Sequence, residues 1–315
     1  MRNNKLKRSL SQFLQSPPNL VLAQTLPVAL LRPYIHALGF AYYLVRRKER
    51  KETSSTIISR VTNGSNQIQK YSLLYNTYRS IFEHYLEKII IATRSPSEMA
   101  EYLIRHCEIG DTRWLDLVEV AGRGGILATG HFGASEFIPV LLAVNGYKVA
   151  AVTVYKSDRL REIARRRAEY YNIWLIDAGQ TRSSFLDFRK AIGNGRILVV
   201  AFDEIEHWVP TRNCWIRVLG DICPADRGLD VLQRRTGAPA CLGLLRRTPR
   251  GSAKKYRLSL HPLSRSEEGR SISASGWEIL ESYIRNYPEQ WYKWNSIARD
   301  LANYRLKETP RNSNA

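Results

Sequence analysis

The stretch GGILATGHFGASE, residues 124–136, decides how the fold of this sequence is interpreted. It contains a short apolar run, Ile126–Thr129, which is typical of a buried strand. Gly130 and Gly133 then allow a tight turn, and residues 134–145 favour a helix. A strand, a glycine turn and a helix in this order begin a β-α-β unit. Polar residues just after such a strand lie at the edge of the sheet where α/β proteins build their sites.

The same rhythm continues towards the C-terminus. Short apolar runs predict further strands at residues 149–154, 174–177, 197–202, 215–219, 240–245 and 256–261. Helices are predicted at residues 158–171, 183–194, 229–235, 276–286 and 289–301. This alternation predicts an α/β fold with a mostly parallel central sheet flanked by helices.

A helical lead-in precedes this core. Apolar residues recur every three or four positions through 67–93, which predicts an amphipathic helix. Ser95-Pro96-Ser97-Glu98 has the form of a capping box, so a second helix should run to about Cys107. The polar residues 53–66 favour a connection. We therefore divide the chain into a basic and apolar segment, 1–60, a globular unit, 61–305, whose α/β core spans about 120–300, and a tail, 306–315, which we expect to be disordered.

Charge narrows the choice of partners. The 315 residues include 48 Lys and Arg against 29 Asp and Glu, a net charge of +19, while a hydrophobic content of 44% excludes wholesale disorder. Such an excess implies nucleic acid, an anionic membrane surface or a phosphorylated substrate as partner. Residues 1–60 alone hold eleven basic and two acidic residues.

Between the basic clusters lies an apolar stretch, residues 19–45. It is long enough to cross a bilayer, but Pro27, Arg32, Pro33 and His36 interrupt it. A cleavable signal peptide fits poorly because no small-x-small site follows. We expect a helix, or a broken pair of helices, in the membrane interface. A short transmembrane anchor and a core helix with a solvated basic arm are the alternatives.

The four cysteines include no CxxC pair, and they are too few for a disulfide scaffold. Buried thiols are expected, although a Cys214–Cys223 bridge stays possible by spacing. The cysteines and histidines show no zinc-ligand spacing, so we expect neither a metal nor a cofactor.

His131 and Glu136 carry the chemistry of the opening stretch. In a continuous helix their spacing of five would turn the side chains about 140° apart. If the helix begins after His131, Glu136 lies in its first turn, where its carboxylate can reach one ring nitrogen and leave the other to remove a proton. Ser135 lacks a nucleophile-elbow motif, so activation of a substrate hydroxyl is favoured over a covalent intermediate. A histidine that only caps the strand is the alternative.

Here the sequence resembles a family. HFGASE at 131–136 is similar to the H-F-x-x-x-E signature of the lipid A late acyltransferases, the lauroyl/myristoyl transferase group within the lysophospholipid acyltransferase superfamily. Further similar elements follow in the family's order: Phe202-Asp203-Glu204 after a strand, Gly220 before a loop and helix, RTGAP at 235–239, and YPEQWYKW at 287–294. The resemblance covers about residues 120–300, and the basic, apolar N-terminus fits the family's membrane anchor.

The resemblance implies a glycerol-phosphate acyltransferase-like fold and an acyl transfer from an acyl carrier protein or coenzyme A thioester. The acceptor would be a hydroxyl of a phosphorylated glycolipid or phospholipid. His131 would be the general base and Glu136 its orienting partner. The resemblance also implies the bacterial inner membrane, with the catalytic domain facing the cytoplasm.

The sequence departs from the family at three places. Ser135 stands where the family often has Trp, Tyr155-Lys156 stands where it usually has Arg, and residues 294–299 lack the His of its W-x-W-x-H-x-R block. A lysine is a point charge and not a bidentate fork, so these departures concern recognition of phosphate or acceptor more than the reaction.

Five residues are further candidates for substrate binding: Lys156, Arg159, Asp203, Arg246 and Arg247. Each basic residue follows a predicted strand or starts the next helix, where a phosphate of donor or acceptor would lie. The arginine-rich helix after residue 158 has its basic side either in solvent or towards the membrane. Alternatively, this side binds an acidic carrier protein or lipid phosphates. Asp203 is a site residue or, equally, a helix cap or salt-bridge partner.

Two other functions are the alternatives. A lysophospholipid or another cell-envelope glycolipid as acceptor would use the same residues. A basic nucleic-acid-binding protein would show base-stacking aromatics interleaved with Lys and Arg, or a binding motif, and the sequence shows neither. It would also leave residues 19–45 unexplained.

Overall fold

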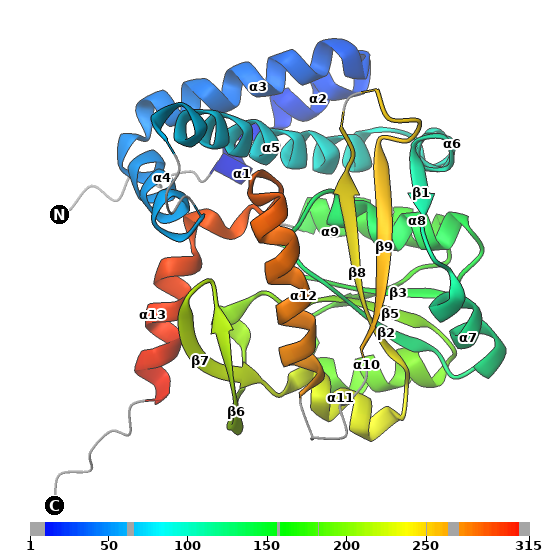
Figure 1. The fold of residues 1–315 in the computed structure, drawn as a ribbon. Coiled ribbons are helices and arrows are strands. Elements are labelled where there is room, and N and C mark those ends of the chain that lie inside the picture. The colour runs from blue at the N-terminus through cyan, green and yellow to red at the C-terminus, as the bar shows by residue number, and fades with distance from the viewer. Residues whose placement is uncertain are drawn as a thin grey trace, which may run out of the picture.

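The computed structural model describes residues 10–61, 66–155, 158–181, 183–249, 251–263 and 271–308. Its centre is a seven-stranded sheet of order β1-β9-β8-β2-β5-β3-β4 (Figure 1). The strands are β1 (Cys107–Ile109), β2 (Gly125–Thr129), β3 (Val149–Thr153), β4 (Trp174–Asp177), β5 (Ile197–Ala201), β8 (Ala240–Arg247) and β9 (Tyr256–Leu263). The β8–β9 pair is antiparallel and the other neighbouring pairs are parallel. The predicted α/β fold with a mostly parallel sheet is confirmed.

Alternate residues of the central strands pack into two separate cores. Leu127 belongs to one core, while its neighbours Ile126 and Ala128 belong to the other, and all three are at most 1% exposed. A strand buried on both faces reads as a continuous apolar run, which is why these strands could be found in the sequence. Helices therefore cover both sides of the sheet.

One face carries α6 (Pro96–His106), α7 (Arg113–Ala121), α8 (Ile138–Val144) and α9 (Asp158–Tyr170). The other carries α10 (Ser184–Gly193), α11 (Gly228–Thr236) and α12 (Ile272–Asn286). The capping box predicted for α6 is present, with the Ser95 hydroxyl accepting from the Glu98 N–H and the Glu98 carboxylate accepting from the Ser95 N–H. Its two reciprocal bonds fix where α6 begins.

The N-terminal residues form a helical layer across the end of the sheet to which β8 points (Figure 1). The layer consists of α1 (Leu10–Leu14), α2 (Pro17–Thr25), α3 (Val28–Val45), α4 (Arg47–Val61) and α5 (Gln67–Thr93). The broken pair of helices expected over 19–45 is present as α2 and α3, separated at Leu26-Pro27. Gly39 permits close packing of α3 on α5, because a Cβ there would lie 2.4 Å from the Phe82 ring.

Among the described residues, α3 is the one helix long and apolar enough to span a membrane by length and composition. Leu31 and Ile35 are fully buried, while Leu30, Leu44 and Val45 on other sides of the helix are 58%, 65% and 82% exposed. This is weak evidence for a membrane segment, because such a helix also occurs in soluble proteins.

Four local predictions were wrong or incomplete. Residues 53–61, expected as part of a connection, belong to helix α4. The hydroxyls of Thr53 and Thr56 donate hydrogen bonds to the backbone carbonyls of Glu49 and Glu52, one turn earlier in the helix. The helix expected at 289–301 is two 3₁₀ turns, η3 (Pro288–Gln290) and η4 (Lys293–Asn295), followed by α13 (Ile297–Glu308). The helix is interrupted because Trp291 forms a β-bridge with Phe132.

The helix expected at 134–145 begins as a 3₁₀ turn, η1 (Ser135–Phe137), before α8. A two-stranded hairpin, β6 (Pro210–Val218) and β7 (Asp221–Asp226), follows the 3₁₀ turn η2 (Ile205–His207) and was predicted only at residues 215–219. All four cysteines are free, so the Cys214–Cys223 bridge is absent.

Candidate active site

His131 and Asp203 meet at the carboxyl ends of two neighbouring strands. β2 and β5 pair in parallel with Thr129 opposite Ala201, so the residues that follow them emerge at the same edge of the sheet. The His131 Nδ1 atom lies 2.7 Å from Asp203 Oδ1, and the His131 backbone N–H donates to Oδ2 at 2.8 Å. One carboxylate thus holds both the ring and the backbone of the histidine.

Asp203 is fully buried and has a third donor. The indole N–H of Trp291 donates to Oδ2 at 2.9 Å, and Trp291 is itself fully buried. Phe132 bridges to Trp291, and the Gly133 N–H donates to the Gln290 carbonyl, so the C-terminal segment is attached to the turn after His131. The carboxylate therefore cannot turn away from the imidazole.

The two pKa values move in opposite directions. Burial alone lowers the pKa of His131, but the charge of Asp203 and its hydrogen bond outweigh burial and raise it. Burial alone raises the pKa of Asp203, but the charge of His131 and the bonds from His131 and Trp291 lower it. Because the carboxylate accepts from Nδ1, the lone pair of the neutral ring is at Nε2.

The Nε2 atom of His131 forms no hydrogen bond within the residues that the structure describes. The His131 side chain is 23% exposed, and Glu204 Oε1 lies 3.6 Å from Nε2. Beside this group, the Lys293 Nζ lies 3.0 Å from Glu206 Oε1, and the positive charge of Lys293 partly opposes the rise in the pKa of His131. A half-open base with a buried carboxylate behind it can remove a proton from a bound hydroxyl.

Glu136 does not occupy the expected place. Its carboxylate lies 2.9 Å from the Nζ of Lys88 on α5, whereas the ring nitrogen that Glu136 was expected to bind is bound to Asp203. The prediction that the Glu136 carboxylate accepts a hydrogen bond from the His131 ring is therefore wrong. The cause is local, because η1 follows a turn at Gly133 whose φ is +60°.

Gly133 is required at that turn. Its φ is positive, and a Cβ at this position would lie 2.0 Å from the Leu245 carbonyl oxygen on β8. The neighbouring Ala134 N–H donates to the same carbonyl at 2.8 Å. The glycine thus lets the turn after His131 press directly against the backbone of β8.

Comparison with known proteins gives a clear family. The model of the bacterial lipid A biosynthesis acyltransferases matches residues 18–294, which is most of the chain and includes every site residue described above. The chain belongs to that family. Among individual curated proteins, the chain has no significant match.

Family membership agrees with the resemblance carried by HFGASE, RTGAP and PEQW, and it makes this protein a member of an enzyme family that transfers acyl groups. In the structure, the PEQW element attaches the C-terminal segment to the site: the Gln290 carbonyl accepts from the turn after His131, and the Trp291 indole donates to the Asp203 carboxylate.

The basic residues predicted to bind substrate lie in different surroundings in the structure. The Arg247 guanidinium donates to Glu87, to Ser80 and to the Gly133 carbonyl, so its donors are committed to the chain itself. Arg246 lies over the ring of Tyr287, 4.6 Å from its centre, and lines a cavity. Arg159 is exposed near the start of α9. Lys156 lies outside the described residues.

Sequence reasoning missed several members of the site. Trp291, Lys293 and Glu204 received no role, although Trp291 and Lys293 lie in the quoted YPEQWYKW element and Glu204 follows Asp203 directly. Lys88 gave no signal, because it lies on a helix that the sequence connects to the site only through the fold.

Proposed function

We propose that this enzyme moves a fatty acyl chain from an acyl carrier protein or coenzyme A thioester to a hydroxyl of a lipid A precursor or related glycolipid, with His131 as general base. One observation carries the proposal: a partly exposed imidazole is bound through Nδ1 to the fully buried Asp203 at the edge of the sheet. Membership in the lipid A biosynthesis acyltransferase family supports the reaction class.

The reaction follows from the direction of the imidazole. Nε2 takes the proton of the acceptor hydroxyl as its oxygen forms a bond to the thioester carbonyl carbon. The carbonyl becomes an oxyanion in a tetrahedral intermediate, which needs positive charge or N–H donors nearby. When the intermediate collapses, the carbon–sulfur bond breaks and the imidazolium returns its proton to the departing thiolate. Acyl ester and free thiol are the products, and the histidine ends as it began.

Two carboxylates have different roles in this proposal. Asp203 is a positioning residue that keeps the proton on Nδ1 and stabilises the imidazolium through its charge. Glu136 is a second positioning residue, because its bond to Lys88 ties η1 to α5 next to the histidine turn. Glu204, 3.6 Å from Nε2, borders the place where the acceptor hydroxyl must lie.

The same proposal includes the membrane. The exposed apolar residues of α3 and the net charge of +19 suit attachment to an anionic inner-membrane surface, with the catalytic domain on the cytoplasmic side. A lysophospholipid or another envelope glycolipid as acceptor is the second candidate, favoured by the departures at Ser135 and Lys156.

The test is acyl transfer by purified His131→Ala protein. We expect its rate to fall to the background, because the imidazole that takes the proton is lost, while circular dichroism shows that the protein is still folded at the assay temperature. His207→Ala removes an exposed histidine on η2 and serves as the control. Both donor thioesters and a panel of lipid A precursors and lysophospholipids are assayed, with products measured by mass spectrometry. Retained transfer in His131→Ala would exclude the mechanism.

A further inference from the structure

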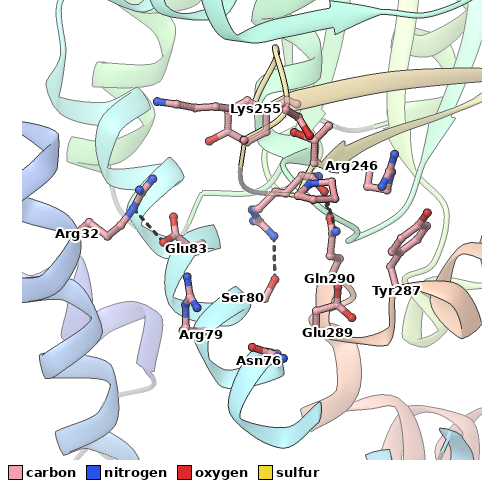
Figure 2. Close-up of a pocket in the computed structure, with 16 residues that line it drawn as sticks. Arg32, Asn76, Arg79, Ser80, Glu83, Arg246, Lys255, Tyr287, Glu289 and Gln290 are labelled. Atoms are coloured by element: carbon pink, nitrogen blue, oxygen red, sulfur yellow. Dashed lines mark hydrogen bonds and ion pairs between the residues drawn. The ribbon is translucent and has the colours of Figure 1, made fainter. Parts of the chain in front are cut away.

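A cavity of about 780 Å³ lies between the N-terminal helices and the β8–β9 hairpin, and His131 and Asp203 are not among its lining residues. Figure 2 shows Arg32 and Arg79 on one side of it and Arg246 with Tyr287 on the opposite side. Lys255 on the hairpin completes the basic lining. Cationic side chains from two layers of the fold therefore converge on one space.

The cations of this cavity differ in what they already bind. Arg32 pairs with Glu83 at 3.0 Å, and Arg247 pairs with Glu87 at 2.6 Å. Arg79, Arg246 and Lys255 form no ion pair with a carboxylate in the part of the chain that the structure describes. Three positive charges thus face the cavity without a protein anion to neutralise them.

The lining contains a second acid beside Glu83, which is Glu289. Burial raises the pKa of Glu289, which favours its neutral form relative to an exposed glutamate. Stacking on Tyr287, 4.6 Å from the Arg246 carbon to the ring centre, holds that guanidinium at the cavity wall with its N–H groups available. An arginine fixed in this way loses little freedom when it binds an oxyanion.

We propose that this cavity binds the phosphate group of a lipid. A phosphate offers three or more acceptor oxygens to converging guanidinium and ammonium groups, and Arg is the side chain best matched to it. The choice of a lipid phosphate rests on α3, which contributes Arg32 to the cavity and is, among the described residues, the helix long and apolar enough to span a membrane. The chains of a lipid whose headgroup lies in the cavity would therefore start next to an apolar helix.

The cavity is joined to the histidine turn by Arg247 and Gln290. The Gln290 side chain bonds to both backbone groups of Arg247, at 2.8 and 2.9 Å, and the Arg247 guanidinium donates to the Gly133 carbonyl at 2.8 Å. The proposed function is needed only to interpret the bound phosphate as that of an acceptor lipid; the existence of an anion site is independent of it.

The experiment is calorimetric titration of the full-length protein in neutral detergent with dihexanoyl phosphatidic acid, and separately with coenzyme A. We expect Arg79→Gln/Arg246→Gln to bind the phosphatidic acid about tenfold more weakly than the parent, or worse, because two charge-assisted bonds are lost. Arg123→Gln/Arg189→Gln removes the same charge from exposed positions outside the lining and should bind as the parent does. The affinity for dihexanoyl glycerol, which lacks phosphate, should be the same in all three proteins.

The two probes separate the sources of phosphate. Weakening for phosphatidic acid alone, or for both probes, supports a lipid phosphate site. Weakening for coenzyme A alone overturns the lipid assignment and gives the cavity to the donor. Equal binding of both probes by the parent and the cavity variant, or an equal loss in the control variant, overturns the anion site. Because no acyl transfer is measured, failure of the His131 mechanism and failure of this site give different results.

Discussion

Two buried ion pairs lie close to the turn after His131, and they have different roles: one holds a reactive group and the other holds the fold together. His131–Asp203 joins a fully buried carboxylate to a ring whose side chain is 23% exposed, and the other ring nitrogen, Nε2, forms no hydrogen bond within the described residues, with Glu204 Oε1 3.6 Å away. Arg247–Glu87 joins side chains that are 15% and 2% exposed, and the guanidinium bonds to three protein partners. The first pair keeps a reactive atom available, whereas the second uses its donors to bind α5, β8 and the histidine turn together.

Burial of charge therefore does not by itself mark a catalytic group. Both pairs have perturbed pKa values: burial lowers that of Arg247, but the charge of Glu87 outweighs burial and the net direction is upward. The two pairs differ in whether an atom that can transfer a proton is left without a hydrogen bond to the protein, as Nε2 of His131 is among the described residues.

The largest expected effect concerns the first pair. Asp203→Asn should lower kcat by about 10²- to 10⁴-fold, because a neutral amide no longer stabilises the imidazolium or fixes the tautomer. The pKa of His131 should fall towards or below its ordinary value, since the Asp203 charge is what raises it. A base works when it is neutral, so the rising limb of the pH–rate profile should move to lower pH.

Glu136→Gln is the matched control for that variant. Its carboxylate is bound to Lys88 and not to the imidazole, so a loss of rate should leave the pH limb where it is in the parent. A shift of the limb in Glu136→Gln, with none in Asp203→Asn, would reverse the two assignments.

The second pair should show itself in stability. Arg247→Met leaves Glu87 buried without its partner and should lower the free energy of unfolding by about 3–5 kcal/mol, measured by urea denaturation. The double variant Glu87→Leu/Arg247→Met should recover much of the loss. Arg285→Met breaks the pair with Glu281, in which Arg285 is 50% exposed, and should cost at most about 1 kcal/mol. Equal losses in the two single variants would refute the distinction.

The smallest expected effect comes from removing the positive charge of Lys293, which lies beside the His131–Asp203 pair. Lys293 lowers the pKa of His131, so Lys293→Gln should raise it and move the pH limb upward, opposite to Asp203→Asn. The rate at neutral pH should fall less than about tenfold, because the base keeps its orienting carboxylate. Lys190→Gln, an exposed lysine on α10, should leave the profile unchanged. A downward move of the limb would contradict the role given to Lys293.

Sequence could predict the elements whose signal is local. The central strands are buried on both faces, so they appear as apolar runs, and α6 carries its own capping box. The β6–β7 hairpin was largely missed because buried and exposed residues are mixed along it: Val218 and Cys223 are fully buried, whereas Trp215 and Ile222 are 62% and 57% exposed, so no continuous apolar run marks the two strands.

The site could be predicted only in part, for the same reason. His131 follows its strand directly, and its position needs only that strand. Its carboxylate partner depends on β5 lying next to β2, which is strand order and not spacing. Proximity in sequence pointed to Glu136, five residues away, while the fold selected Asp203, which is 72 residues away.

The attachment of Trp291 to Phe132 has a consequence for the order in which the chain becomes a catalyst. His131 and Asp203 are already present when residue 203 has been synthesised, but the third donor to Asp203 comes from a residue 88 positions later. Until that indole arrives, the Asp203 carboxylate lacks the bond from Trp291 to Oδ2, and the turn after His131 lacks the Gln290 carbonyl that accepts from the Gly133 N–H. A nascent chain, or one shortened before Gln290, would therefore contain His131 and Asp203 without the two hydrogen bonds involving Gln290 and Trp291 that align them. Synthesis of the C-terminal segment is then the last step in assembling the site.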